Sequence, residues 1–130
     1  MILLDTNICV AHLNGDPRVA RPMQEHASEI AVPSLVATEL FYGFEKSSRA
    51  AANLPRLRQF LQTVQVVDYD IATAEIAGRL KAYLDRIGKK TGEMDILIAA
   101  AAVRHNALLV TNNLRHFENA PGIRLENWLQ

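Results

Sequence analysis

The sequence predicts an α/β fold built on a small parallel sheet, and three observations support this prediction. Short apolar runs without polar alternation recur along the chain, which is typical of strands buried on both faces. Longer segments with apolar residues three or four positions apart lie between these runs, as in amphipathic helices. Polar turn residues mark the boundaries. Because strands and helices alternate, we expect parallel pairing with right-handed crossovers.

The first quarter of the chain is predicted to contain two strands and two helices. Residues 1–4 are an apolar run that forms the first strand. The Asp-Thr-Asn sequence that follows ends this strand and caps a helix over 8–13. An Asn-Gly-Asp-Pro turn separates that helix from a second helix over 17–26. A second strand is expected over 29–32.

Two further helical segments lead to the third strand. Ser34 caps the first of them, which carries an apolar stripe at steps of four residues. The second segment continues to about residue 64, and Pro55 is expected to kink or restart it. The valine-rich residues 65–68 are predicted to be the third strand.

The remaining elements are a long helix, an apolar helix, a fourth strand and a short edge strand. They are predicted over residues 71–87, 94–105, 107–110 and 123–125. Asp70 caps the long helix and Gly88 ends it. The helix over 94–105 is apolar all round, so it must be buried against the sheet. A polar loop from Thr111 to His116 follows the fourth strand, and Trp128 is expected to pack near the end of the chain.

Length and composition limit the class of protein. The 130 residues fit one domain, and 49% hydrophobic residues are enough for one core. The chain has no apolar run long enough to span a membrane and no export signal. The single Cys9 cannot form an internal disulfide, so a cytoplasmic location is expected. Cys9 itself is interpreted as a small buried hydrophobic residue.

The charge balance excludes nucleic-acid binding by bulk charge alone. Fourteen basic side chains match fourteen acidic ones. A local basic rim around an acidic centre is still compatible with this balance. The four histidines are scattered without metal-ligand spacing, which argues against a zinc site. His116 lies near the loop after the fourth strand, where it is a surface residue or a phosphate contact.

Three carboxylates, Asp5, Glu39 and Asp95, interrupt otherwise apolar elements. Taken singly, Asp5 and Asp95 can be helix caps and Glu39 can face solvent. Sites in open parallel sheets form beyond the carboxyl ends of the strands, where these acids could meet. Converging carboxylates repel one another unless a cation lies between them. Their oxygen atoms suit Mg²⁺ or Mn²⁺, which would activate water against a phosphodiester.

Four blocks in this order together resemble a PIN domain. They are Asp5-Thr6-Asn7 after an apolar strand, Glu39 after Pro33-Ser34, the segment from Asp95 to Ala100, and Leu109-Val110-Thr111-Asn112-Asn113 followed by Phe117. The spacing and length resemble the VapC-type toxins of type II toxin–antitoxin pairs. The resemblance covers essentially the whole chain. It implies a three-layer α/β/α fold with a small central parallel sheet, in a single PIN domain over residues 1–130.

The resemblance also implies an endoribonuclease that depends on Mg²⁺, with Mn²⁺ as a substitute. In this pattern Asp5, Glu39 and Asp95 match the catalytic acids and metal ligands. Many members of the family have a fourth acid at the position that Asn113 occupies here, so Asn113 is included in the catalytic set with an uncharged oxygen ligand. The expected supporting positions, which orient ligands or the substrate phosphate, are Asn7, Thr111 and Asn112. Glu93 either adds to the acid set or is a surface acid.

Partners are implied by the same resemblance. They are an RNA substrate, a cognate VapB-type antitoxin that covers the active site with a peptide segment, and a second copy of the chain in a homodimer. The antitoxin groove is expected between the helix that bears Leu40, Phe41 and Phe44 and the helix that bears Leu57, Phe60 and Leu61. Some close relatives cut the anticodon loop of initiator tRNA, and the Thr-Asn-Asn block resembles theirs, which suggests a tRNA substrate.

Two other phosphate-handling classes do not fit the sequence. A haloacid dehalogenase-type phosphatase needs an acid at position 7, where this chain has Asn7. A receiver domain needs a late lysine in the sheet, but Lys90 is the last lysine and lies in a loop. A catalytically silent RNA-binding or protein-docking module on the same fold stays open, because Asn113 removes one charge from the site.

Overall fold

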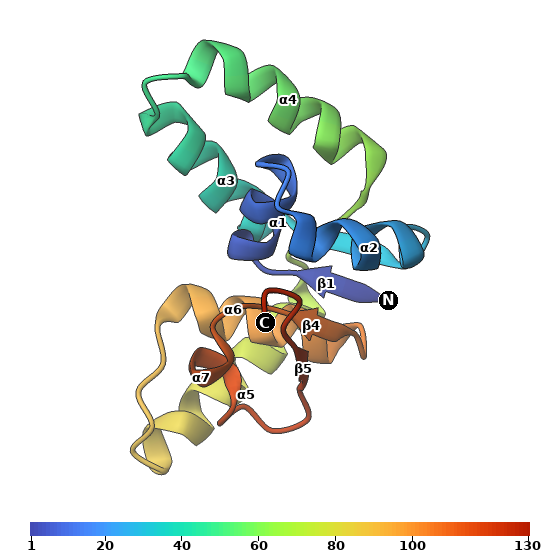
Figure 1. The fold of residues 1–130 in the computed structure, drawn as a ribbon. Coiled ribbons are helices and arrows are strands. Elements are labelled where there is room, and N and C mark those ends of the chain that lie inside the picture. The colour runs from blue at the N-terminus through green and yellow to red at the C-terminus, as the bar shows by residue number, and fades with distance from the viewer.

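A parallel sheet of five strands, in the order β3-β2-β1-β4-β5, forms the centre of the molecule (Figure 1). The computed structural model describes residues 1–130. The strands are β1 (Ile2–Leu4), β2 (Ile30–Pro33), β3 (Gln65–Val67), β4 (Leu108–Val110) and β5 (Arg124–Glu126). Every neighbouring pair is parallel. The predicted strands are therefore all present, each within one or two residues of its expected bounds.

The central strands form the floor of the core. Leu3, Leu4, Leu109 and Val110 are fully buried, as strands covered on both faces must be. The edge strand β5 is mostly exposed. One hydrophobic cluster of 31 buried residues connects the strands with the helices on either side. The unbroken apolar runs of β1 and β4 follow directly from this two-sided burial.

Helices cover both faces of the sheet, in three layers (Figure 1). One layer contains α1 (Thr6–Leu13), α2 (Pro17–Glu25), α3 (Ser34–Lys46) and α4 (Ala50–Thr63). The other contains α5 (Ile71–Arg86), α6 (Glu93–Arg104) and α7 (Leu114–Phe117). The chain moves outward from β1 to β2 and β3, then returns to place β4 on the other side of β1. Right-handed crossovers in opposite directions put the two groups of helices on opposite faces.

The switch in direction lies between β1 and β4. These strands are neighbours with Leu4 opposite Val110, so the residues after them, Asp5 and Thr111, are level at the carboxyl edge. The backbone N–H of Asp5 donates to the carbonyl oxygen of Val110 at 2.9 Å. After β1 the chain enters α1 on one face, and after β4 it enters α7 on the other. Such a divergence opens the crevice in which sites of parallel α/β proteins form.

Two of the predicted elements differ in detail from the structure. The helix α4 continues through Pro55, where a kink or restart was expected. Pro55 is exposed, so water can bond the carbonyl that the proline leaves free, while buried Leu54, Leu57 and Phe60 hold the helix on the core. The predicted polar loop after β4 contains the short helix α7, which Phe117 anchors in the core. No helix is both long and apolar enough to span a bilayer.

Candidate active site

Asp5 is a buried carboxylate at the carboxyl end of β1, with only 5% of its surface exposed. Its Oδ1 atom accepts the backbone N–H of Thr6 at 2.8 Å, so Asp5 is the N-cap of α1. Its Oδ2 atom accepts the hydroxyl of Thr111 at 2.7 Å and the amide of Asn7 at 3.4 Å. The carboxylate is thus both a helix cap and the centre of a polar cluster, and the two interpretations do not exclude each other.

The loops after β1 and β4 are joined by polar side chains around Asp5. Thr111 is fully buried, and its hydroxyl also accepts the backbone N–H of Asn113 at 3.0 Å. The Asn7 side-chain oxygen accepts the backbone N–H of Asn112 at 2.9 Å. Asn112 in turn accepts the Asn127 amide at 3.1 Å. The expected supporting positions Asn7, Thr111 and Asn112 therefore lie together, and they fix the orientation of Asp5.

Asp95 lies in the first turn of α6 and is half-buried. Burial raises its pKa above the ordinary value of 3.8. The charge of His116 opposes this shift, and the negative charge of Asp5 adds to it. The Nδ1 atom of His116 lies 3.1 Å from Asp95 Oδ2. The influence of Asp5 on the Asp95 pKa shows that these two acids share one electrostatic environment, although 90 positions separate them.

Glu39 lies on α3 and is half-buried. Its Oε1 atom accepts the hydroxyl of Thr6 at 2.5 Å. Because Thr6 directly follows Asp5, this hydrogen bond links the third predicted acid to the loop after β1. The expected orientation of Glu39 toward the sheet edge is consistent with this contact.

The site consists of oxygen ligands, which suit a hard cation. Among the His, Cys, Asp and Glu side chains, no group of three lies close enough to hold one metal ion. The three predicted carboxylates therefore do not form a preformed cage in this structure. Mg²⁺ retains several waters and needs only one or two carboxylates from a protein. Asp5 and Asp95 could hold it, because the charge of Asp5 is among the causes that raise the pKa of Asp95.

The other candidate residues lie outside this polar cluster. Asn113 is exposed, and its side chain makes no hydrogen bond, although its backbone joins the Thr111 hydroxyl. Glu93 pairs with Lys81 at 2.9 Å on the surface. Of its two interpretations, a member of the acid set or a surface acid, the structure therefore supports the surface acid. Burial, with the charge of Asp5 beside it, raises the pKa of the Cys9 thiol far above its ordinary range. The thiol therefore stays protonated and unreactive.

The contact between His116 and Asp95 is the feature that sequence reasoning undervalued. Position 116 was interpreted mainly as a surface histidine, and the residue is indeed exposed. The short helix α7 turns its ring back toward the start of α6. A predicted helix over 114–117 would have given the missing signal.

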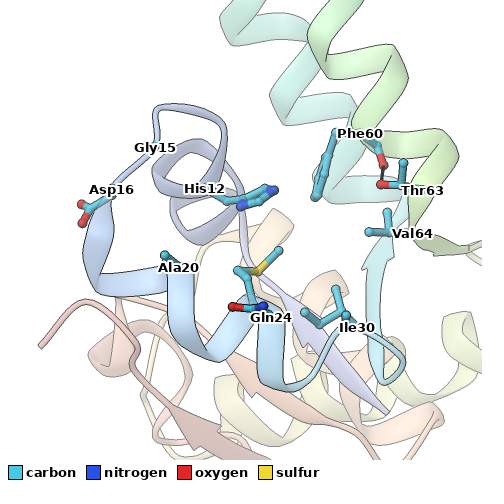
Figure 2. A pocket seen from close by; sticks show the side chains of 11 residues that line it. His12, Gly15, Asp16, Ala20, Gln24, Ile30, Phe60, Thr63 and Val64 are labelled. Carbon is cyan, nitrogen blue, oxygen red and sulfur yellow. Dashed lines mark hydrogen bonds between the residues drawn. The ribbon is translucent and has the colours of Figure 1, made fainter.

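The residues predicted to line a groove between α3 and α4 differ in burial. Leu40, Leu57 and Phe60 are buried in the core, whereas Phe41, Phe44 and Leu61 are partly buried. A hollow of about 510 Å³ lies between α4 and the α1–α2 pair (Figure 2). On one side of it the ring of His12 lies 5.2 Å from that of Phe60, and Ile30 at the start of β2 forms part of its lining. This hollow is at the amino ends of the strands, away from Asp5 and Asp95.

Comparison with known proteins identifies relatives along nearly the whole chain. The model of the PIN domain family matches residues 2–123. The tRNA(fMet)-specific endonuclease VapC of Salmonella typhimurium is 38% identical over 127 residues, which are 97% of this chain and 96% of the relative. Ribonuclease VapC2 of Haemophilus influenzae is 38% identical over 128 residues, with 98% and 97% covered.

Solved structures have the same fold. A chain of the DNA-bound VapBC complex from Salmonella typhimurium superposes with a TM-score of 0.93 at 37% identity, covering 98% of this chain and 97% of that one. A chain of VapBC2 from Rickettsia felis, bound to a DNA fragment from its promoter, gives a TM-score of 0.91 at 37% identity and covers 98% and 99%. The likeness extends over the sheet, both helical layers and the loops that carry the polar cluster.

Proposed function

The chain belongs to the PIN domain family, and from this premise we propose that it is an endoribonuclease and the toxin of a toxin–antitoxin pair. Relatives that align with nearly all of this chain are named ribonucleases or endonucleases. The reaction is hydrolysis of an RNA phosphodiester bond. Two structural neighbours at 37% identity are chains of VapBC complexes from Salmonella typhimurium and Rickettsia felis.

One observation carries this proposal at the level of the site. A buried carboxylate, Asp5, lies at the switch point of the sheet with Thr111 and Asn7 bonded to it. A second carboxylate, Asp95, is close enough to feel its charge. Two carboxylates that lie close together repel each other, which destabilises the fold. Their presence at this site therefore indicates a role that depends on a bound cation.

We propose that Asp5 and Asp95 hold Mg²⁺, or Mn²⁺ in its place, directly, and that Glu39 and Asn113 reach the ion through ordered waters. Such an ion supplies a water of lowered pKa as the nucleophile and neutralises charge on the scissile phosphate. The chain itself orients the acids. Thr111 and Asn7 fix the Asp5 carboxylate, and Thr6 fixes that of Glu39. His116 fixes the Asp95 carboxylate from the side of α7.

The proposed substrate is tRNA, with initiator tRNA as the first candidate. The proposal follows from the name of the Salmonella typhimurium relative, a tRNA(fMet)-specific endonuclease. Neutral net charge means that affinity must come from local cations near the site, not from the whole surface.

The proposed partner is a VapB-type antitoxin, and the proposed assembly contains two copies of this chain. The apolar hollow between α4 and the α1–α2 pair suits apolar side chains of a docked segment (Figure 2). Coexpression with the antitoxin and size-exclusion chromatography would measure this assembly.

The experiment that tests the function uses purified chain, initiator tRNA and Mg²⁺. We expect discrete cleavage products that EDTA abolishes and that Asp5→Ala abolishes as well. The exposed variant Glu93→Gln, which loses an acid two positions from Asp95, is the matched control and should cut like the wild type. Binding of tRNA without any cleavage, unchanged in Asp5→Ala, would contradict the proposal. That result would favour the catalytically silent module, which the uncharged Asn113 leaves open.

A further inference from the structure

A second hollow, of about 360 Å³, lies directly beside Asp95. It is enclosed by the loop before α6, the first turn of α6, and α7 with the turn that follows. Its lining contains no apolar side chain, which sets it apart from the hollow of Figure 2. The charged and titratable residues in the lining are Lys90, Asp95, Arg115 and His116. The hollow therefore suits a small polar group and not an apolar one.

Two cations of this hollow have no acidic partner. Lys90 and Arg115 are exposed, and none of the ion pairs of the protein includes either of them. Cations on α5 and α6 do have such partners: Lys81 pairs with Glu93, and Arg104 lies 3.5 Å from Asp70. The one acid in the lining, Asp95, contacts His116 and neither of these two cations. Two cations against one acid leave the lining with an excess of positive charge at the edge of the catalytic cluster.

We infer that this hollow is a binding site for the RNA backbone, and that Lys90 and Arg115 contact a phosphate next to the one that is cut. The inference rests on the proposed function. An RNA strand carries one negative charge per nucleotide, so a strand with its scissile phosphate at Asp5 and Asp95 has further phosphates close by. Arg115 can bond such a phosphate through two N–H groups, while Lys90 adds a point charge. Asn119 and Thr91 offer additional hydrogen bonds within the same lining.

This site explains how a chain of zero net charge can hold RNA. The negative acids repel the substrate, and a cation bound there offsets that repulsion only locally. Positive side chains beside the acids draw the backbone across them and fix its register. Contacts of this kind position the strand but carry no sequence information. The hollow therefore determines affinity and alignment and leaves the choice of the cut sequence to other residues.

The test measures affinity for initiator tRNA by fluorescence anisotropy in EDTA, where no cleavage occurs. Arg115→Gln and Lys90→Gln should each weaken binding about fivefold, as expected for loss of a partly exposed charge contact. Each variant should also reduce the slope of log K against log[salt] by about 0.7, the value for one phosphate contact with a single strand. Arg115→Glu should weaken binding further. Lys89→Gln in the same loop and Arg58→Gln on α4, neither of which lines the hollow, are the matched controls.

Binding and cleavage are measured separately, so the two proposals can fail separately. With Mg²⁺ and saturating tRNA, Arg115→Gln should keep a kcat within about twofold of the wild type while KM rises. If Arg115→Gln and Lys90→Gln bind tRNA with the affinity and salt dependence of Arg58→Gln and Lys89→Gln, the phosphate site is wrong. If the wild type never cuts tRNA, the endoribonuclease proposal is wrong, whatever the binding data show.

Discussion

The hydroxyl of Thr111 donates a 2.7 Å hydrogen bond to Asp5 Oδ2, and this contact joins residues 106 positions apart in the chain. Both residues are buried at the carboxyl edge of the sheet, one after β4 and one after β1. The same hydroxyl accepts the backbone N–H of Asn113. Thr111 therefore couples the orientation of the central carboxylate to the path of the loop that follows β4.

Replacing Thr111 with valine tests this coupling. Valine keeps the shape but leaves the buried Asp5 Oδ2 atom with only the longer, 3.4 Å hydrogen bond from the Asn7 amide. We expect the free energy of unfolding to fall by about 1.5–3 kcal/mol, the range for hydrogen bonds to charged groups. RNA cleavage should fall by about 10- to 100-fold, as for loss of a group that orients a metal ligand. Urea unfolding and single-turnover cleavage measure the two effects.

Thr111→Ser is the control for this variant, because serine retains the hydroxyl. It should retain most of the activity that valine loses. Equal loss of cleavage in Thr111→Ser and Thr111→Val would show that the methyl group matters and that the hydrogen bond to Asp5 does not.

Asp95→Asn should stabilise the metal-free protein at pH 7 and abolish cleavage. Burial, with the charge of Asp5 added, holds the pKa of Asp95 above its ordinary value of 3.8, although His116 opposes the shift. The folded state therefore binds this proton more tightly than the unfolded chain does. The stabilising contribution is fully present below pH 3.8 and is lost as the pH rises through the raised pKa. Urea unfolding in EDTA at pH 7 and pH 3 measures the difference, which should shrink at the lower pH.

Glu93→Gln is the matched control with the opposite sign. In the wild type, the hydrogen bond from Lys81 and the charge of Lys81 lower the pKa of Glu93. Neutralising this acid therefore removes a favourable interaction. The variant should be no more stable than the wild type at pH 7. An Asp95→Asn protein that is less stable than the wild type in EDTA would mean that the charge of Asp95 helps to hold the fold.

Local sequence signals predicted the parts of the site that lie at the ends of apolar strands. Asp5 ends β1, and Thr111 ends β4, so the topology of a parallel sheet was enough to expect them at one edge. The cap of α5 was equally local, because Asp70 accepts the backbone N–H of Thr73 three residues later. These features depend on a few neighbouring residues and on the order of the strands.

Features that depend on packing between distant elements were not predicted correctly. Helical propensity alone predicts a kink or restart at Pro55, yet the helix does not restart there, because buried Leu54 and Leu57 hold α4 on the core. The contact of His116 with Asp95 depends on a single-turn helix that periodicity cannot detect. How closely the three carboxylates approach one another also depends on rotamers set by partners such as Thr6, and no group of three lies close enough to hold one ion in this structure. Their role as cation ligands stays a prediction.

Asn113→Asp should strengthen metal binding. Asn113 is exposed at the start of α7, and its backbone is tied to the Thr111 hydroxyl beside Asp5. An added negative charge here increases the charge count of the ligands, which tunes the affinity of cation sites. We expect the Mg²⁺ concentration that gives half-maximal cleavage to fall about threefold to tenfold. Asn14→Asp, an exposed change at the end of α1, should leave this concentration unchanged.

If Asn113→Asp and Asn14→Asp require the same Mg²⁺ concentration as the wild type, position 113 does not contribute to the cation site. The catalytic set would then be limited to residues of the loop after β1 and the helices α3 and α6.

A calorimetric titration of the chain with Mn²⁺ at pH 7 tests most directly the claim that these acids form a cation site. We expect the wild type and the surface variant Glu93→Gln to bind Mn²⁺ with equal affinity. Asp5→Asn and Asp95→Asn should each bind at least about tenfold more weakly, and Glu39→Gln should also bind more weakly. Binding of Mn²⁺ with the same affinity in the wild type, Asp5→Asn and Asp95→Asn would contradict the account.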